Sequence, residues 1–127
     1  MILNLSDLSD EPLHAQMSRQ IRAKILSRDL AGGDTLPSIR RLAREQRVSV
    51  ITVQRAYEDL EREGLVRSRR GKGFWVAPIT EGRKHKMAED RFATALETLV
   101  AHAAAEGLTD VDMRRILDEL LNSEARR

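Results

Sequence analysis

Residues 36–76 read LPSIRRLAREQRVSVITVQRAYEDLEREGLVRSRRGKGFWV, and this stretch decides the fold of the chain. Ser38 and Ser49 are favourable N-caps, and each precedes a short amphipathic helical pattern. A short turn separates the two patterns, so the helices are expected to cross steeply. Two β-prone runs, 65–67 and 74–76, then flank a basic loop. This order predicts a winged helix-turn-helix, which places one helix in the DNA major groove and a basic hairpin beside it.

The boundaries of these elements follow from apolar spacing and from turn-forming residues. We expect the turn between the helices at residues 45–48 and the end of the second helix at Gly64. Gly71 and Gly73 allow the positive φ angles that the tip of the hairpin, residues 68–73, requires. The apolar stripes facing the core are Ile39, Leu42 and Ala43 in the first helix, and Val53, Ala56, Tyr57 and Leu60 in the second.

An arm and a further helix are predicted before this stretch. Residues 1–10 show neither a helical nor a strand period, and we interpret them as an extended arm that lies on the domain or on a partner subunit. A helix should start near Asp10 to Pro12, because Asp can cap a helix and Pro is tolerated in its first turn. Gly32 and Gly33 should end it. Its apolar residues are Leu13, Met17, Ile21 and Ile25, widened by Leu26 and Leu30.

The remaining chain predicts a helical tail. Pro78 and Gly82 indicate a linker, and a helical pattern runs from about Thr80 until Gly107 breaks it. Thr109 opens a last helix with Asp112 at its third position. The expected fold is mostly α with a small β-hairpin. We expect two domains, a winged helix-turn-helix with its arm over residues 1–77 and a two-helix tail over residues 78–127.

The apolar faces of the tail predict a homodimer. Two amphipathic helices cannot bury both of their apolar stripes alone, so the tail either folds back on the winged helix or pairs with a second subunit. We favour pairing, because a twofold dimer sets two recognition helices about 34 Å apart, on two half-sites of one duplex. The predicted dimerisation residues are Phe92, Leu96, Leu99, Val100, Met113, Ile116, Leu117, Leu120 and Leu121.

Charge and composition limit the class of protein. The net charge is only +2, but residues 38–76 hold ten Lys and Arg against five Asp and Glu, a surplus that favours a phosphate backbone unless it is merely a solvated basic face. The chain has no cysteine, which excludes disulfides and thiolate metal sites. No apolar run is long enough to cross a bilayer and no secretory signal pattern is present, so we expect a cytoplasmic protein without a membrane partner.

The segment 12–76 resembles the GntR family of bacterial transcription regulators. The matching pieces are the Pro-led first helix, GDTLPSIRRLA over 33–43, VQRAY over 53–57, LEREGL over 60–65 and RGKG over 70–73. The short helical tail resembles that of the YtrA subfamily, in which it serves dimerisation. The resemblance implies a repressor, often of its own operon or of genes for ABC transporters, that binds a double-stranded DNA operator. The operator sequence and any small-molecule effector stay unidentified.

The resemblance and the chemistry of the side chains together give the candidate DNA contacts. Arg40 matches an arginine that reaches DNA, and Gln54 could read adenine. Arg55 suits either phosphate or a nearby carboxylate. The family often has polar or basic residues after the cap, whereas this chain has Val50 and Ile51, which either contact thymine methyl groups or lie partly buried under the turn. The candidates are Ser38, Arg40, Arg41, Ser49, Val50, Ile51, Thr52, Gln54, Arg55, Arg69, Arg70, Gly71 and Lys72.

Other chemistry is weakly supported by the sequence. His14, His85 and His102 lack metal-ligand spacing, and no nucleophile motif or phosphate-cradling loop is present, so we expect no metal site, no cofactor and no enzyme activity. The main alternative is a winged-helix adaptor that binds protein rather than DNA. An enzyme subunit or small-molecule sensor would need a pocket, which we do not expect so short a tail to build.

Overall fold

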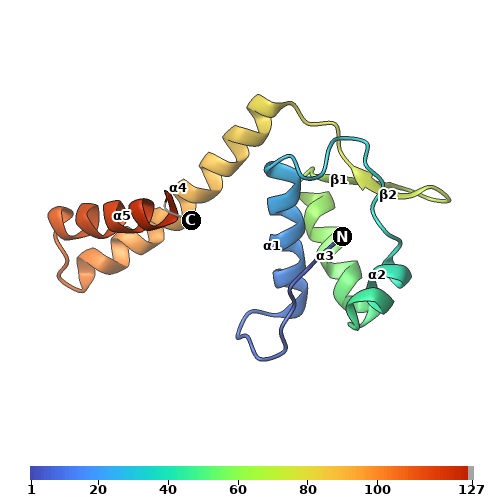
Figure 1. The fold of residues 1–127 in the computed structure, drawn as a ribbon, viewed down its shortest axis with the longest axis horizontal. Coiled ribbons are helices and arrows are strands. Elements are labelled where there is room, and N and C mark those ends of the chain that lie inside the picture. The colour runs from blue at the N-terminus through green and yellow to red at the C-terminus, as the bar shows by residue number, and fades with distance from the viewer. Residues whose placement is uncertain (126–127) are drawn as a thin grey trace. The chain divides into compact units, whose positions relative to one another are not determined.

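The computed structural model describes residues 1–125, which form five helices and one antiparallel hairpin (Figure 1). Two compact units divide the chain, one from Met1 to His85 and one from Lys86 onward. Within residues 1–125, no helix combines the length and the apolar character needed to cross a bilayer. The elements are α1 (Leu13–Leu26), α2 (Ile39–Gln46), α3 (Val50–Arg62), β1 (Val66–Arg69), β2 (Gly73–Val76), α4 (Glu81–Ala105) and α5 (Asp110–Ala125).

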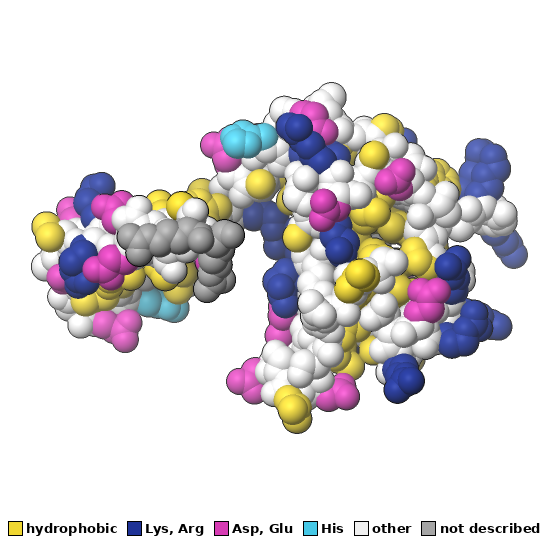
Figure 2. Space-filling view, in the orientation of Figure 1, with side chains coloured by type: hydrophobic (Ala, Val, Ile, Leu, Met, Phe, Trp, Pro, Cys, Tyr) yellow, Lys and Arg dark blue, Asp and Glu magenta, His cyan; other side chains and the backbone are white. Residues whose placement is uncertain are grey.

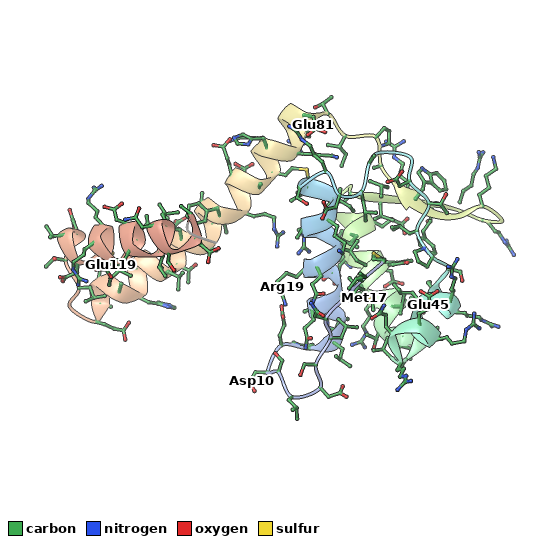
Figure 3. All side chains as sticks on the ribbon, viewed as in Figure 1. Asp10, Met17, Arg19, Glu45, Glu81 and Glu119 are labelled. Carbon is green, nitrogen blue, oxygen red and sulfur yellow. The ribbon has the colours of Figure 1, made fainter. Side chains whose placement is uncertain are left out.

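The core of the first unit lies where α1, α2 and β1 pack against α3. Met17 on α1 is fully buried and faces α3, whereas Arg19 lies on the outer side of α1 (Figure 3). At one edge of this core, the guanidinium of Arg22 donates two hydrogen bonds, of 3.0 and 2.8 Å, to the carboxylate of Glu63 at the end of α3. Most of the predicted core is confirmed, whereas Leu13, Leu26, Leu30 and Ile39 are only half-buried. The fully buried members are Met17, Ile21, Ile25, Leu42, Val53, Ala56, Tyr57 and Leu60.

The N-terminal arm lies on α1 of its own chain. The backbone N–H of Asn4 donates to the side-chain oxygen of Gln20, and the Gln20 amide donates back to the carbonyl of Asn4, both at 2.7 Å. The backbone N–H of Ser6 donates to the side chain of Gln16 at 2.9 Å. The expected start of the helix was too early, because α1 begins at Leu13 after Pro12 and has no side-chain cap.

The expected end of α1 at Gly32 and Gly33 was wrong. The helix ends at Leu26, and Arg28 follows with a φ of 78°. The two glycines serve the hairpin instead, because Gly33 donates its N–H to the carbonyl of Val76 at 2.8 Å. A Cβ on Gly32 would lie 3.0 Å from the Cα of Pro78, so this close approach of two backbones favours glycine.

Two N-caps and one residue with a left-handed backbone conformation define the ends of α2 and α3 and the turn between them. Ser38 accepts a hydrogen bond from the N–H of Arg41 at 3.2 Å, and Ser49 accepts one from the N–H of Thr52 at 3.1 Å, so both predicted caps are confirmed. The turn comes later than expected, because α2 continues to Gln46 and Arg47 reverses the chain with a φ of 56°.

The boundary after the wing also differs from expectation. Gly82 lies inside the first turn of α4 rather than in a linker. Lys84 is buried, and Glu81 pairs with Arg28 at the end of α1, so this turn packs with the first unit. The structural division therefore falls after His85 instead of Ala77.

The second unit consists of the rest of α4 and α5. Thr109 and Asp112 form the predicted capping box, in which the Thr109 N–H donates to the Asp112 carboxylate at 2.9 Å and the Asp112 N–H donates to the Thr109 hydroxyl at 3.2 Å. The hydrogen bonds from the backbone and then the hydroxyl of Thr109 lower the pKa of Asp112. An apolar groove of about 220 Å³ opens between the helices, lined by residues that include Leu96, Leu99, Val100, Met113, Ile116, Leu117 and Leu120.

Candidate nucleic-acid interface

The first part of the candidate interface is the outer face of α2, which is strongly cationic. The Ser38 cap sets the first turn of this helix, and Arg40 and Arg41 follow it on the exposed side. These two arginines differ in their hydrogen bonding. The guanidinium of Arg41 donates to the carboxylate of Glu45 at 2.7 Å, and this bond lowers the pKa of Glu45. Arg40 has no ion pair or hydrogen bond among residues 1–125, so its fork can reach an external anion directly.

The second part is the first turn of α3. The hydroxyls of Ser49 and Thr52 lie 2.9 Å apart and bond to each other, and the Ser49 hydroxyl also accepts the Thr52 N–H as the N-cap of α3. Val50 and Ile51 are 45% and 61% exposed, so neither side chain is enclosed under the turn, although Val50 is partly covered. Their exposed side chains lie off the buried stripe of α3, at the helix N-terminus where the first backbone N–H groups have no intrahelical partner.

Further along α3, Gln54 and Arg55 continue the exposed face. The Gln54 amide donates to the Glu58 carboxylate at 3.1 Å, and its carbonyl oxygen stays available as an acceptor. Arg55 forms no ion pair within the described part of the chain, although Glu58 is three residues away. Because the acidic residues of α3 begin at Glu58, its N-terminal half carries only positive charge.

The third part is the wing. In the hairpin, Val66 pairs with Val76, Arg67 with Trp75, Ser68 with Phe74 and Arg69 with Gly73. The tip is narrow, because the Lys72 N–H donates to the Arg69 carbonyl at 2.9 Å while Gly71 and Gly73 have φ of 83° and 82°. Arg70 and Lys72 are exposed at the tip as predicted, whereas Arg69 lies on β1 rather than in the loop.

The register of β1 adds a residue that sequence reasoning missed. The Ser68 hydroxyl donates to Glu61 on α3 at 2.9 Å, so Ser68 faces α3. Because side chains alternate along a strand, Arg67 and Arg69 point to the opposite face. Arg44 and Arg47 on the α2 side are likewise exposed and were not among the predicted contacts. Period-two alternation was the signal that could have identified Arg67.

Together these parts give one basic surface on the first unit. Lys and Arg side chains gather at the wing tip and around α2, on one edge of the unit in Figure 2. Within residues 1–125, no cluster of three or more His, Cys, Asp or Glu has the arrangement of a metal site. The arginine side chains, backbone N–H groups and narrow basic loop of this surface can bind and position a polyanion.

The chain is similar in sequence to known bacterial regulators. The family model described as "Bacterial regulatory proteins, gntR family" matches residues 13–76. The uncharacterized transcriptional regulator YhcF of Bacillus subtilis is 34% identical over 83% of this chain and 86% of its own length. The transcriptional repressor YtrA of Bacillus subtilis is 32% identical over 77% of this chain and 73% of its own length.

Solved structures agree with the sequence matches. A transcriptional antiterminator from Listeria monocytogenes has a TM-score of 0.74 at 26% identity, and the match covers 94% of this chain and 90% of that one. The DNA-binding domain of AraR, solved in complex with the operator ORX1, has a TM-score of 0.53 at 29% identity over 61% of this chain and 95% of that chain. The first of these confirms the winged helix-turn-helix with two C-terminal helices.

Proposed function

Because the chain belongs to the gntR family of bacterial regulatory proteins, which are DNA-binding transcriptional regulators and not enzymes, we propose that it is a dimeric repressor of an inverted-repeat operator. The observation that carries this proposal is the basic surface formed by α2, the first turn of α3 and the wing. Within residues 1–125, Arg40, Arg55 and Arg70 of this surface have no intramolecular partner, whereas Arg41 is paired with Glu45.

In this proposal α3 is the recognition helix and enters the major groove. Its exposed N-terminal turn, from Ser49 to Thr52, would face the base edges, with Gln54 and Arg55 behind it. Arg40 would hold the backbone beside it, because a guanidinium bonds phosphate through two N–H groups. Ser38 and Arg41 would support this contact, Ser38 by capping α2 and Arg41 by adding charge next to Arg40.

The wing would enter the adjacent minor groove. Its tip has glycine at residue 71, so the backbone there carries no side chain that would widen it. Arg70 and Lys72 flank this glycine and are exposed, and the narrow minor groove concentrates negative potential that attracts such cations. Arg69 would contact the phosphates at the rim of the groove.

Dimerisation through residues 78–127 would supply the second half-site. Apolar side chains of this tail stay exposed in the single chain, with Leu99 at 62% and Val111 at 74%. Contiguous exposed apolar surface marks an interaction site, and a second copy offers the same surface to a twofold partner. The predicted residues Phe92, Leu99, Val100, Ile116, Leu120 and Leu121 are exposed, while Leu96, Met113 and Leu117 are half-buried in the groove between the helices.

Repression is supported by the relative YtrA, which is itself a transcriptional repressor. We infer that the protein occupies a promoter and so represses genes next to its operator. Its own operon is the first candidate, and genes for ABC transporters are the second.

The proposal is tested by titrating DNA with the protein at several salt concentrations. A fluorescent duplex from the region upstream of its own gene should bind with an affinity that falls steeply with salt, because bound phosphates release counterions. Arg40→Ala should weaken binding about tenfold or more and reduce the salt slope by about one.

Arg19→Ala is the matched control, since it removes the same charge from the outer side of α1, where Arg19 pairs with Glu11. This variant should bind DNA like the parent protein. Equal affinities and equal salt slopes for the parent and Arg40→Ala would contradict the assignment and favour the protein-binding adaptor.

A further inference from the structure

The first turn of α3 carries an exposed apolar pair that the core does not use. Val50 is 45% exposed and Ile51 is 61% exposed, whereas Val53, Ala56 and Leu60 on the same helix are fully buried. In the first unit, the other large apolar side chains that stay exposed are Met1, Ile2 and Leu8 of the N-terminal arm. Val50 and Ile51 are therefore the exposed large apolar residues of the helix-turn-helix, and packing within the chain does not explain why they are apolar.

The polar groups around this pair are already engaged. The Ser49 hydroxyl accepts from the Thr52 N–H and bonds the Thr52 hydroxyl, so neither hydroxyl is fully free for a base edge. One hydrogen of the Gln54 amide is held by Glu58. A DNA groove that receives this turn therefore contacts mainly the two branched apolar side chains. Arg47 precedes them and Arg55 follows them in the sequence, and neither has an ion pair within residues 1–125.

We propose that Val50 and Ile51 read the 5-methyl groups of thymine in the major groove. This inference rests on the proposed function, because it requires the N-terminal turn of α3 to enter that groove. The thymine methyl is the apolar feature that an unmodified base pair presents there, and aliphatic side chains gain by covering it. The operator would accordingly carry thymines opposite this turn.

Uracil tests the inference, because replacing thymine with deoxyuridine removes only the methyl group. A duplex is first selected from a random DNA library with the parent protein, and is then made with thymine or with uracil throughout. The parent should bind the uracil duplex about fourfold more weakly for each contacted methyl, which corresponds to about 0.8 kcal/mol per buried carbon.

The double variant Val50→Ala and Ile51→Ala should bind both duplexes with equal affinity. Both side chains are exposed and alanine favours helix, so the variant is expected to fold, and circular dichroism checks this. Leu8→Ala is the matched control, because Leu8 is an exposed apolar residue of the arm, and it should discriminate between the duplexes like the parent.

Three other outcomes would overturn the inference. The parent could bind the two duplexes equally, or the double variant could still prefer thymine as strongly as the parent does. In both cases, weaker binding by Arg40→Ala to both duplexes would leave the proposed function standing. Failure to select any duplex, with Arg40→Ala indistinguishable from the parent, would overturn the proposed function and this inference together.

Discussion

Tyr57 connects three parts of the DNA-binding unit through one side chain. Its hydroxyl donates to the carbonyl of Pro37 at 2.7 Å, just before α2, and its ring lies 4.8 Å from that of Phe74 on β2. Tyr57 itself belongs to α3 and is fully buried. A single residue thus holds the recognition helix against both the entry to α2 and the wing. Burial, and then the nearby Glu45 carboxylate, raise the pKa of this hydroxyl.

The raised pKa of Tyr57 predicts how stability depends on alkaline pH. An unperturbed tyrosine titrates near pH 10.0, so above that pH the unfolded chain loses a proton that the folded chain keeps. The contribution of Tyr57 is therefore complete below pH 10.0 and is lost as the pH rises further. The chain contains one tyrosine, so the ultraviolet absorbance change that accompanies tyrosinate formation reports this residue alone. Tyrosinate should form only as the protein unfolds, and tyrosinate at pH 10.0 with native circular dichroism would contradict the buried hydrogen bond.

Residues whose role depends on near neighbours in sequence were predicted well. Ser38, Ser49 and Thr109 cap helices as expected, because a cap bonds a backbone N–H within three residues. The pairing of Arg41 but not Arg40 could not be predicted, because the rotamers of exposed arginines decide it. The exposure of Val50 and Ile51 also depends on where the rest of the unit packs, so the sequence left both alternatives open.

Near the end of α2, replacing an arginine with glycine is expected to have opposite effects on the free energy of unfolding at two neighbouring positions. Arg47 has a φ of 56°, a left-handed conformation that is unfavourable for side chains with a Cβ, so Arg47→Gly should raise the free energy of unfolding by up to about 1 kcal/mol. Arg44 lies within α2, so Arg44→Gly should lower it by about 1 kcal/mol. Urea denaturation followed by circular dichroism measures both. If both variants lowered the free energy of unfolding by a similar amount, Arg47 would not have a left-handed conformation in solution.

The ends of elements were harder to predict than their existence. Leu30 continues the apolar period of α1, yet the chain leaves the helix after Leu26 so that the loop can reach β2. Gly82 resembles a helix breaker, but it lies in the exposed first turn of α4, where glycine has only a modest cost. After α1, contacts with distant residues override the local pattern, and a single sequence does not reveal such contacts.

For the whole molecule, we expect a dimer whose formation depends on the helical tail, residues 78–127. Sedimentation velocity at micromolar concentration should give the mass of two chains. Leu99→Lys should give one chain with the helices retained, because a charge on the exposed apolar face opposes its burial in an interface. Leu8→Lys changes an equally apolar, exposed residue of the arm and should leave the dimer intact. A monomeric parent protein would contradict dimerisation through residues 78–127.

Hydroxyl-radical footprinting measures how two chains would be arranged on DNA. On a duplex selected by the parent protein, we expect two protected patches related by twofold symmetry, with centres roughly 34 Å, one helical turn, apart. Arg40→Ala should weaken both patches together. A single patch without symmetry would contradict the dimeric reading of an inverted repeat, and the absence of protection at protein concentrations that saturate the duplex would contradict α3 as a recognition helix.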